Sequence, residues 1–129
     1  MTKTGDLRPT DAELHILKVL WQRGPSTVRE VHEILNSQKP TMYTTVLKLL
    51  QIMTEKGLVK RNDEQRAHVY VAAFEREHTQ RQLVGDLLER VFDGSARQLV
   101  MQALSKRKTS ADELAEIRQM LDEYERGTE

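Results

Sequence analysis

Two segments near the start of the chain repeat apolar residues every three or four positions, which is the period of an amphipathic α-helix. The first opens on Thr10 with Glu13 three residues later and stops at a Gly-Pro pair. The second opens on Thr27, again with an acid three residues later at Glu30, and ends at Asn36. A threonine followed at this distance by glutamate is a capping box, in which each residue satisfies a backbone N–H at the helix start. The pattern predicts two consecutive short helices.

A third helical segment follows Pro40, starting near Thr41 and ending at Gly57. One stripe along it is apolar or aromatic and is expected to face the core: Tyr43, Val46, Leu47, Leu50 and Met53. The opposite stripe is unusual for a surface helix, because threonine is a mediocre helix former. Its members are Thr41, Thr44, Thr45, Lys48 and Ile52.

The periodicity then changes from helical to strand-like. Leu58–Arg61 and His68–Val71 read as two short strands on either side of a polar turn, residues 62–65. Three short helices followed by a hairpin form a winged helix-turn-helix, in which the hairpin is the wing. We expect this domain to occupy residues 1–74 of a mainly α protein with a small β-hairpin.

Residues 75–129 read as three further helices whose apolar stripes are too small to form an independent core. A second copy of the chain is the simplest partner for these stripes, so we expect a homodimer and a helical dimerisation region. The residues expected at this interface are Leu83, Leu87, Leu88, Val91, Phe92, Leu99, Val100, Leu104, Leu114, Ile117 and Leu121.

Composition narrows the function without deciding it. The net charge is zero, but residues 1–74 hold 11 Lys/Arg against 8 Asp/Glu, a net of +3, and residues 75–129 hold 9 against 12, a net of −3. The asymmetry suggests a weakly basic module joined to an acidic one. The chain has no cysteine, no signal-like segment and no apolar run long enough to enter a membrane, so we expect a cytoplasmic protein.

The threonine-rich stripe favours DNA as the partner. A side chain that enters the major groove must be short and must offer hydrogen-bonding groups, and threonine adds a methyl group that can pack on thymine. Lys48 supplies charge one turn further on, Lys39 lies at the helix entrance, and Arg66 lies in the wing, where it can reach a phosphate or the minor groove. A threonine-rich face can also be merely solvated, but its position between a helix-turn and a hairpin favours DNA binding.

Other chemistry is not indicated. His15, His32, His68 and His78 lie on four different segments without cysteine, so no metal site or cofactor is expected. The chain lacks a glycine-rich phosphate loop, a nucleophile elbow and the H-E-x-x-H zinc motif, so an enzyme is not expected.

Several stretches together resemble the BlaI/MecI family of penicillinase-type repressors. They are "TDAELHILKVLW", "TVREVHEIL", "YTTVLKLLQ", "KGLV", "RAHVYVA" and the "VFDGS" corner at residues 91–95. The resemblance runs from Leu7 to about Tyr124. It implies a dimeric winged-helix repressor that binds double-stranded DNA at a palindromic operator. It also implies that Thr41, Thr44, Thr45 and Lys48 read the DNA and that Arg66 is the wing arginine.

In well-known members of that family a membrane sensor-protease cuts the repressor, so such a protease is a further partner to consider. Gln102 and Ala103 stand at the matching cleavage position, where cleaved members have Asn-Phe, which argues against release by proteolysis. Two further departures are Gln65 in place of a common glycine and Ile52 in place of a common arginine. The absence of cysteine excludes the copper-sensing branch. The alternative hypothesis is a winged-helix module that binds protein without specific DNA binding.

Overall fold

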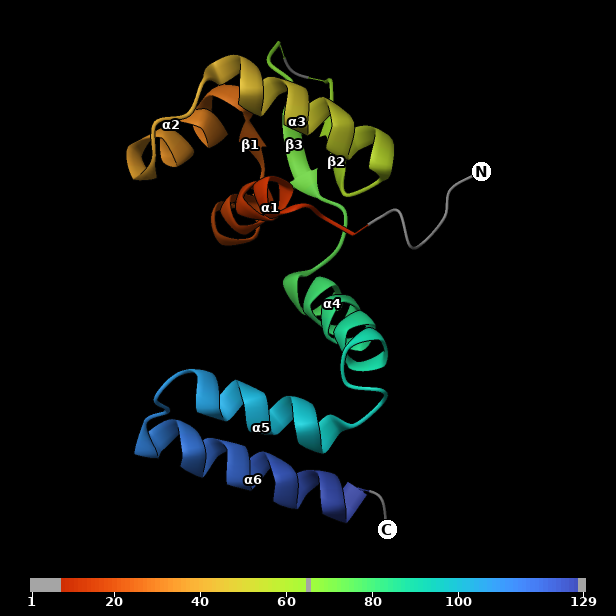
Figure 1. Ribbon diagram of the computed structural model, residues 1–129. Coiled ribbons are helices and arrows are strands. Elements are labelled where there is room, and N and C mark those ends of the chain that lie inside the picture. The colour runs from red at the N-terminus through yellow and green to blue at the C-terminus, as the bar shows by residue number, and fades with distance from the viewer. Residues whose placement is uncertain (1–7, 65, 128–129) are drawn as a thin grey trace. The chain divides into compact units, whose positions relative to one another are not determined.

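The computed structural model describes residues 8–64 and 66–127, which divide into two compact units between Leu83 and Val84. The mainly α fold with a small sheet agrees with the expectation from the sequence (Figure 1). In chain order the elements are α1 (Asp11–Arg23), β1 (Ser26–Thr27), α2 (Val28–Gln38), α3 (Tyr43–Lys56), β2 (Val59–Asn62), β3 (Val69–Ala72), α4 (Arg76–Arg90), α5 (Ala96–Lys106) and α6 (Ala111–Gly127).

The first two helices begin where their capping boxes predict. The hydroxyl of Thr10 accepts the backbone N–H of Glu13, whose carboxylate accepts the N–H of Thr10 in return. Thr27 and Glu30 repeat this arrangement at the start of α2. Each box satisfies two of the backbone donors that a helix start leaves open.

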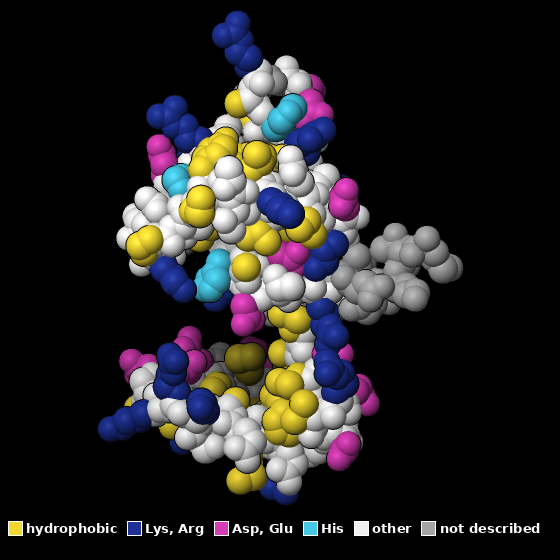
Figure 2. Space-filling view, turned by 45° about the horizontal axis from the view of Figure 1, so that its top comes forward, with side chains coloured by type: hydrophobic (Ala, Val, Ile, Leu, Met, Phe, Trp, Pro, Cys, Tyr) yellow, Lys and Arg dark blue, Asp and Glu magenta, His cyan; other side chains and the backbone are white. Residues whose placement is uncertain are grey.

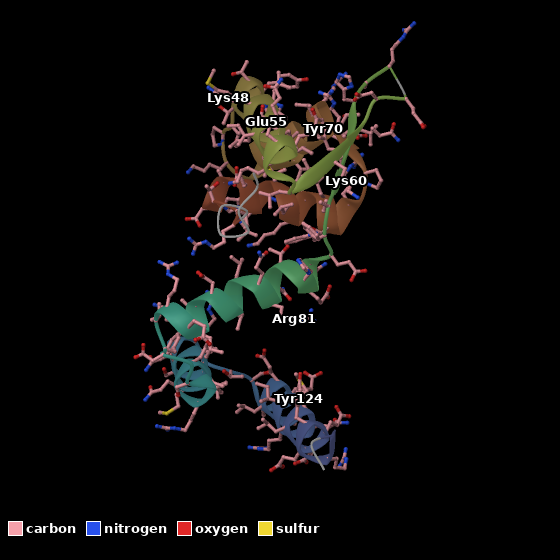
Figure 3. The ribbon with its side chains drawn as sticks, turned by 90° about the vertical axis from the view of Figure 1, so that its right-hand side faces the viewer. Lys48, Glu55, Lys60, Tyr70, Arg81 and Tyr124 are labelled. Carbon is pink, nitrogen blue, oxygen red and sulfur yellow. The ribbon has the colours of Figure 1, made fainter. Side chains whose placement is uncertain are left out.

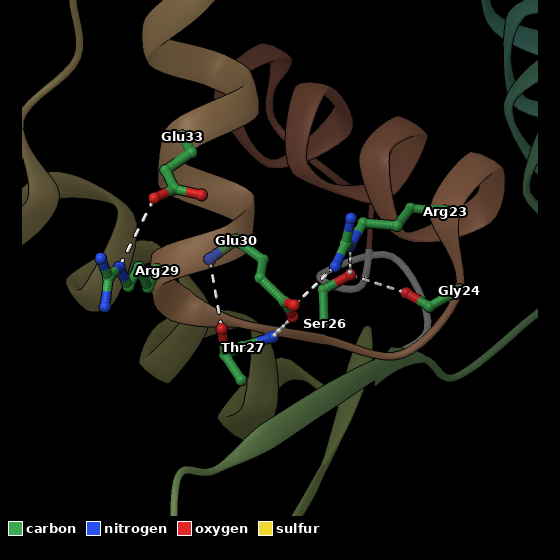
Figure 4. A network of polar contacts seen from close by, with 7 residues as sticks. All are labelled: Arg23, Gly24, Ser26, Thr27, Arg29, Glu30 and Glu33. Carbon is green, nitrogen blue, oxygen red and sulfur yellow. Dashed lines mark hydrogen bonds and ion pairs between the residues drawn. The ribbon is translucent and has the colours of Figure 1, made fainter.

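A polar network fixes the approach to α2 (Figure 4). The Arg23 guanidinium binds the Glu30 carboxylate at 2.6 Å and also donates to the hydroxyl of Ser26. That hydroxyl donates to the carbonyl of Gly24, at 2.8 Å. Gly24 itself has φ +93°, a conformation that favours glycine. The short connection between α1 and α2 is therefore held at both ends.

The wing belongs to a three-stranded sheet rather than to an isolated hairpin. β3 lies in the middle of the sheet and pairs antiparallel with β2 on one side and with β1 on the other. The sequence pattern did not predict β1, which is only two residues long and pairs Ser26 with Tyr70. Both predicted hairpin strands are present, and each begins one residue later than expected. The extra strand ties the wing to the helices.

One hydrophobic core fills the space between α1, α2, α3 and the sheet. Its members are Ile16, Leu17, Val19, Leu20, Val28, Val31, Val46, Leu50, Met53, Leu58, Val59 and Tyr70. Trp21 is partly buried against it and donates its indole N–H to the carbonyl of Phe74 at 2.9 Å. Trp21 is therefore part of the packing.

A long-range ion pair adds to this core. The ammonium of Lys56, at the end of α3, binds the Glu13 carboxylate on α1 at 2.7 Å and the Arg8 carbonyl at 3.3 Å. The Glu13 side chain is only 3% exposed. A buried carboxylate needs such a partner because burial removes its hydration. The pair fixes the far end of α3 against α1.

The second unit contains the later part of α4 together with α5 and α6. The turn after α4 holds Asp93 and Gly94 at positive φ, and the N–H of Gly94 returns to the carbonyl of Leu88. Ser95 caps α5 and Ser110 caps α6, each through its hydroxyl, which accepts a backbone N–H three residues later. No side chain of α5 or α6 is buried.

Candidate nucleic-acid interface

The outward face of α3 is set by the core behind it. Val46, Leu50 and Met53 are fully buried on the inner face. Thr44, Thr45 and Lys48 are exposed, and their side chains have no hydrogen-bond or ion-pair partner among the described residues. The helix is therefore anchored on one side and presents hydroxyl and ammonium groups on the other.

The entrance to α3 differs from the expectation. The helix begins at Tyr43, two residues after the expected start near Thr41. The N–H of Thr41 donates to the side chain of Asn36 at 2.9 Å, and its hydroxyl donates to the carbonyl of Lys39 at 2.7 Å. Its carbonyl lies 2.7 Å from Nε2 of His32, which is the donor in this contact. These bonds hold Thr41 to α2, which extends to Gln38 rather than ending at Asn36.

Thr41 and Lys39 thus lie in the connection before α3. The hydroxyl hydrogen of Thr41 is directed at a backbone carbonyl, so toward a ligand this group is an acceptor. Lys39 is exposed, and its side chain makes no hydrogen bond or ion pair with a described residue. Both residues lie beside the start of the helix rather than on its outward stripe.

Two exposed side chains at this end were not expected there. Met42, the N-cap residue, is 70% exposed and gives no side-chain cap. Tyr43 is 45% exposed, so its assignment to the core stripe was wrong. Its ring contacts that of His32 edge-on, with centroids 5.6 Å apart. Because Tyr43 lies in the first turn of α3, its ring packs on the side of α2 and not against the residues beneath the middle of the helix.

The wing carries an ordered polar cluster next to its tip. The Asp63 carboxylate binds Nε of Arg61 at 2.8 Å and Nδ1 of His68 at 2.7 Å. The hydrogen bond to Asp63 raises the pKa of Arg61 above its ordinary value, so the guanidinium stays charged but is already paired. Arg66 is exposed and no described residue pairs with it. Gln65, the departure at the wing tip, lies outside the described residues.

Positive charge is spread around α3 rather than gathered in one patch. Figure 2 brings this helix towards the viewer and shows Lys and Arg side chains separated by uncharged and hydrophobic ones. Figure 3 labels Lys48 and Glu55 on α3 and Lys60 on β2. Lys60 is exposed without a described partner, whereas Arg61 beside it is held by Asp63. Lys60 and Arg66 are therefore the available cations of the wing.

Two residues on the outward face of α3 were missed by the sequence reasoning. Gln51 and Glu55 are exposed and continue the line of Thr44 and Lys48 at spacings of three and four residues. The same period that identified the helix would have found them. On this side of the helix, the threonine-rich stripe predicted from the sequence ends at Lys48 and therefore did not include them.

In the second unit the predicted interface residues lie open. Ten of the eleven predicted residues lie in this unit, and Leu83 is the last residue of the first. None of the eleven is buried, and the exposed ones are Leu87, Val91, Val100, Leu104 and Leu121. Gln102 and Ala103 are exposed within α5. That helix must open locally before a protease can hold the bond between them in an extended form.

Neither a metal centre nor a membrane segment is found in the parts of the chain that the structure describes. Over residues 8–64 and 66–127 there is no group of three or more His, Asp or Glu side chains that could hold a metal ion. No helix within these ranges is both long and apolar enough to cross a membrane.

Comparison with known proteins finds a matching family model and several similar proteins. A family model described as "Penicillinase repressor" matches residues 9–123. "Transcriptional regulator BlaI" of Mycobacterium tuberculosis is 35% identical over 128 residues, which cover 98% of this chain and 88% of the relative. "Penicillinase repressor" of Bacillus licheniformis is 25% identical and is matched over 89% of this chain and 90% of its own length.

A solved structure gives the same result for the first unit. It is described as the solution structure of the DNA binding domain of the repressor BlaI. It superposes with a TM-score of 0.51 at 26% identity, covering 59% of this chain and 90% of that domain. The winged-helix fold expected from the sequence is therefore confirmed.

Proposed function

The chain belongs to the penicillinase repressor family, whose members are transcriptional repressors and not enzymes, and on this basis we propose that it is a dimeric repressor of a palindromic operator. The observation that carries the proposal is the outward face of α3. Its threonines and Lys48 are exposed and without described partners, while the other side of the helix is locked in the core. A rigid helix with available polar groups is what major-groove binding requires.

The contacts divide by position. Thr44, Thr45 and Lys48 enter the major groove, where hydroxyl and ammonium groups meet base edges and phosphates. Lys39, at the entrance to α3, binds a backbone phosphate. Thr41 binds a phosphate after its hydroxyl hydrogen turns from the Lys39 carbonyl to a phosphate oxygen. Arg66 reaches a phosphate or the minor groove from the wing. The wing is rigid enough for this role because β1 and the Asp63 cluster hold it.

Dimerisation is supported by the second unit. Its helices expose large apolar side chains, and none of its residues in α5 or α6 is buried. Covering such faces with a second copy removes apolar surface from water, at a gain of roughly 25 cal/mol per Å². A twofold dimer then places two copies of α3 about 34 Å apart, or at another whole-turn spacing, in successive grooves. Occupation of a promoter in this way blocks polymerase.

The test starts with selection of bound duplexes from a random library. The wild-type protein is expected to enrich a palindrome. Lys48→Ala and Arg66→Ala should each weaken binding to that duplex about 5- to 10-fold and reduce the dependence on salt by about one counterion. Arg118→Ala, which removes an exposed arginine from α6, is the matched control and should bind as the wild type does.

Two results would contradict the proposal. Sequence-blind binding by the wild type, without a palindrome, would favour a protein partner for the winged helix. Unchanged binding by both Lys48→Ala and Arg66→Ala would reject the proposed contact surface. Sedimentation separates the dimer from the DNA contacts, because the two contact variants should remain dimeric at micromolar concentration. A monomeric wild type would reject the dimer.

A further inference from the structure

The outward line of α3 contains four polar residues and extends beyond the end of the threonine stripe. Thr44, Lys48, Gln51 and Glu55 follow at intervals of four, three and four, so they lie along one side of the helix. Val46, Leu50 and Met53 occupy the opposite side and are fully buried. Gln51 is therefore directed away from the core, on the face proposed to meet DNA.

The amide of Gln51 has no structural task within the described chain. It is exposed, and neither its carbonyl nor its NH₂ group bonds a described residue. Thr54, on the next turn, instead donates its hydroxyl to the carbonyl of Leu50 at 2.8 Å. Gln51 therefore keeps both a donor and an acceptor available to a ligand.

The chemistry of a glutamine amide selects one base. In the major groove an adenine presents N7 as acceptor and N6 as donor, and a glutamine side chain can pair with both at once. No other base presents this pair in the same arrangement. Gln51 lies three residues beyond Lys48, which is about 4.5 Å along the helix and comparable to the roughly 3.4 Å rise between base pairs. The two residues can therefore contact neighbouring base pairs.

Glu55 limits the contact at the far end of the line. Its exposed carboxylate has no described partner and would be repelled by the phosphates on both sides of the groove. The approach of α3 is then closest over its first two and a half turns, which end at Gln51. Gln51 is therefore the last residue on this line that lies close enough to the groove to contact a base.

We propose that Gln51 is a specificity-determining residue that reads one adenine in each half-site through paired hydrogen bonds. The proposal rests on the proposed function, since it requires a duplex bound by α3. Gln51 would then determine which base is preferred at one position of each half-site, rather than the overall affinity for DNA.

The experiment repeats the random-duplex selection with the full-length wild type, Gln51→Ala and Gln51→Arg, and with Gln98→Ala as a control. Gln98 is an exposed glutamine on α5. The wild type should enrich a palindrome with an adenine at one symmetric position. Gln51→Ala should keep the rest of the palindrome and lose roughly 5- to 140-fold discrimination at that position. Gln51→Arg should prefer guanine there, because arginine pairs with guanine N7 and O6.

The outcomes separate this proposal from the proposed function. If the wild type enriches no palindrome, the repressor function fails and this proposal fails with it. If the wild type and Gln51→Ala enrich the same palindrome with the same base preferences, the function stands and the role of Gln51 is overturned. Equal loss at every position in Gln51→Ala would also overturn it, because a backbone contact does not select a base. Loss confined to one adenine, with Gln98→Ala unchanged, supports it.

Discussion

Both units of this chain contain short amphipathic helices, but the interactions that hold the helices together differ between the two units. In the first unit, apolar stripes, a three-stranded sheet and a long-range ion pair meet in one core. In the second unit, the apolar residues of α5 and α6 are all at least partly exposed, and the ion pair between Arg90 and Asp86 is local. The difference teaches that amphipathic periodicity specifies a helix in either case, whereas stability depends on having another surface to cover it.

The largest difference in stability is expected between truncation of a buried leucine in the first unit and truncation of an exposed leucine in the second. Leu50 is fully buried, whereas Leu121 is 58% exposed. Leu50→Ala should lower the free energy of unfolding by about 2–5 kcal/mol, because it removes packed atoms and leaves a cavity. Leu121→Ala should change the unfolding of the first unit by less than about 0.5 kcal/mol in dilute protein. Urea titrations followed by the fluorescence of Trp21, the single tryptophan, measure both. Equal losses would contradict the comparison.

A smaller difference in stability is expected between breaking the ion pair of the buried Glu13 and breaking an exposed ion pair of the second unit. Lys56→Ala leaves the buried carboxylate of Glu13 with the N–H of Thr10 as its remaining described partner. The expected loss is about 1–3 kcal/mol, the cost of an incompletely satisfied buried group. Arg90→Ala removes one partner of an exposed pair and should cost about 1 kcal/mol or less. The same urea titrations apply, and a Lys56→Ala protein as stable as the wild type would show that the Glu13 carboxylate is hydrated.

Removal of a helix cap should also affect the unfolding transition differently in the two units. Thr27→Ala removes the cap of α2 and should cost the first unit about 1 kcal/mol. Ser95→Ala removes the matching cap of α5 in the second unit. It should lower helix content by circular dichroism without moving the Trp21 transition. A shift of that transition in Ser95→Ala would mean that the two units unfold together.

The smallest expected effect concerns pH. The backbone N–H of Thr27 donates to the Glu30 carboxylate and lowers the pKa of Glu30 below its ordinary value of 4.5, with further help from Arg23. The folded state therefore favours the ionised form, so this contribution is complete above about pH 4.5 and is lost as the pH falls through the lower folded pKa. The gap in urea midpoint between wild type and Glu30→Gln should be constant at neutral pH and should close as the pH falls below about 4.5. A gap that stays constant at low pH as well would mean that the charge of Glu30 does not matter.

No such titration is expected at the start of α5. The residue three positions after its cap is Gln98, which has no charge to lose. The cost of Ser95→Ala should therefore be the same at pH 7 and pH 3. A pH-dependent cost would point to a titrating group near α5 that the cap geometry does not contain.

Much of the fold could be predicted because its signals are local. Thr10 with Glu13 and Thr27 with Glu30 mark helix starts within four residues of sequence, and both pairs form as predicted. The strand β1 could not be predicted in this way. It is two residues long, and Ser26 gains its partner only through pairing with Tyr70, 44 residues later.

The candidate site was predicted in part for the same reason. The outward placement of Thr44, Thr45 and Lys48 follows from helical period once the core side is known. Thr41 was expected on the helix because nothing in the sequence shows that Asn36 and His32 would hold it. Tyr43 was expected in the core because helical spacing places it on the same stripe as Val46 and Leu50, yet here its ring packs at the edge beside His32.

The sequence by itself determined the limits of the helices and of the two hairpin strands, to within about two residues, and which stripes are apolar. The tertiary structure decided that β1 forms, that α3 begins at Tyr43 and not at Thr41, and which flank of α3 stays open. Capping and periodicity act between residues a few positions apart, so one sequence window contains them. Exposure of a flank depends on which distant segments pack against it, and no local window contains those partners.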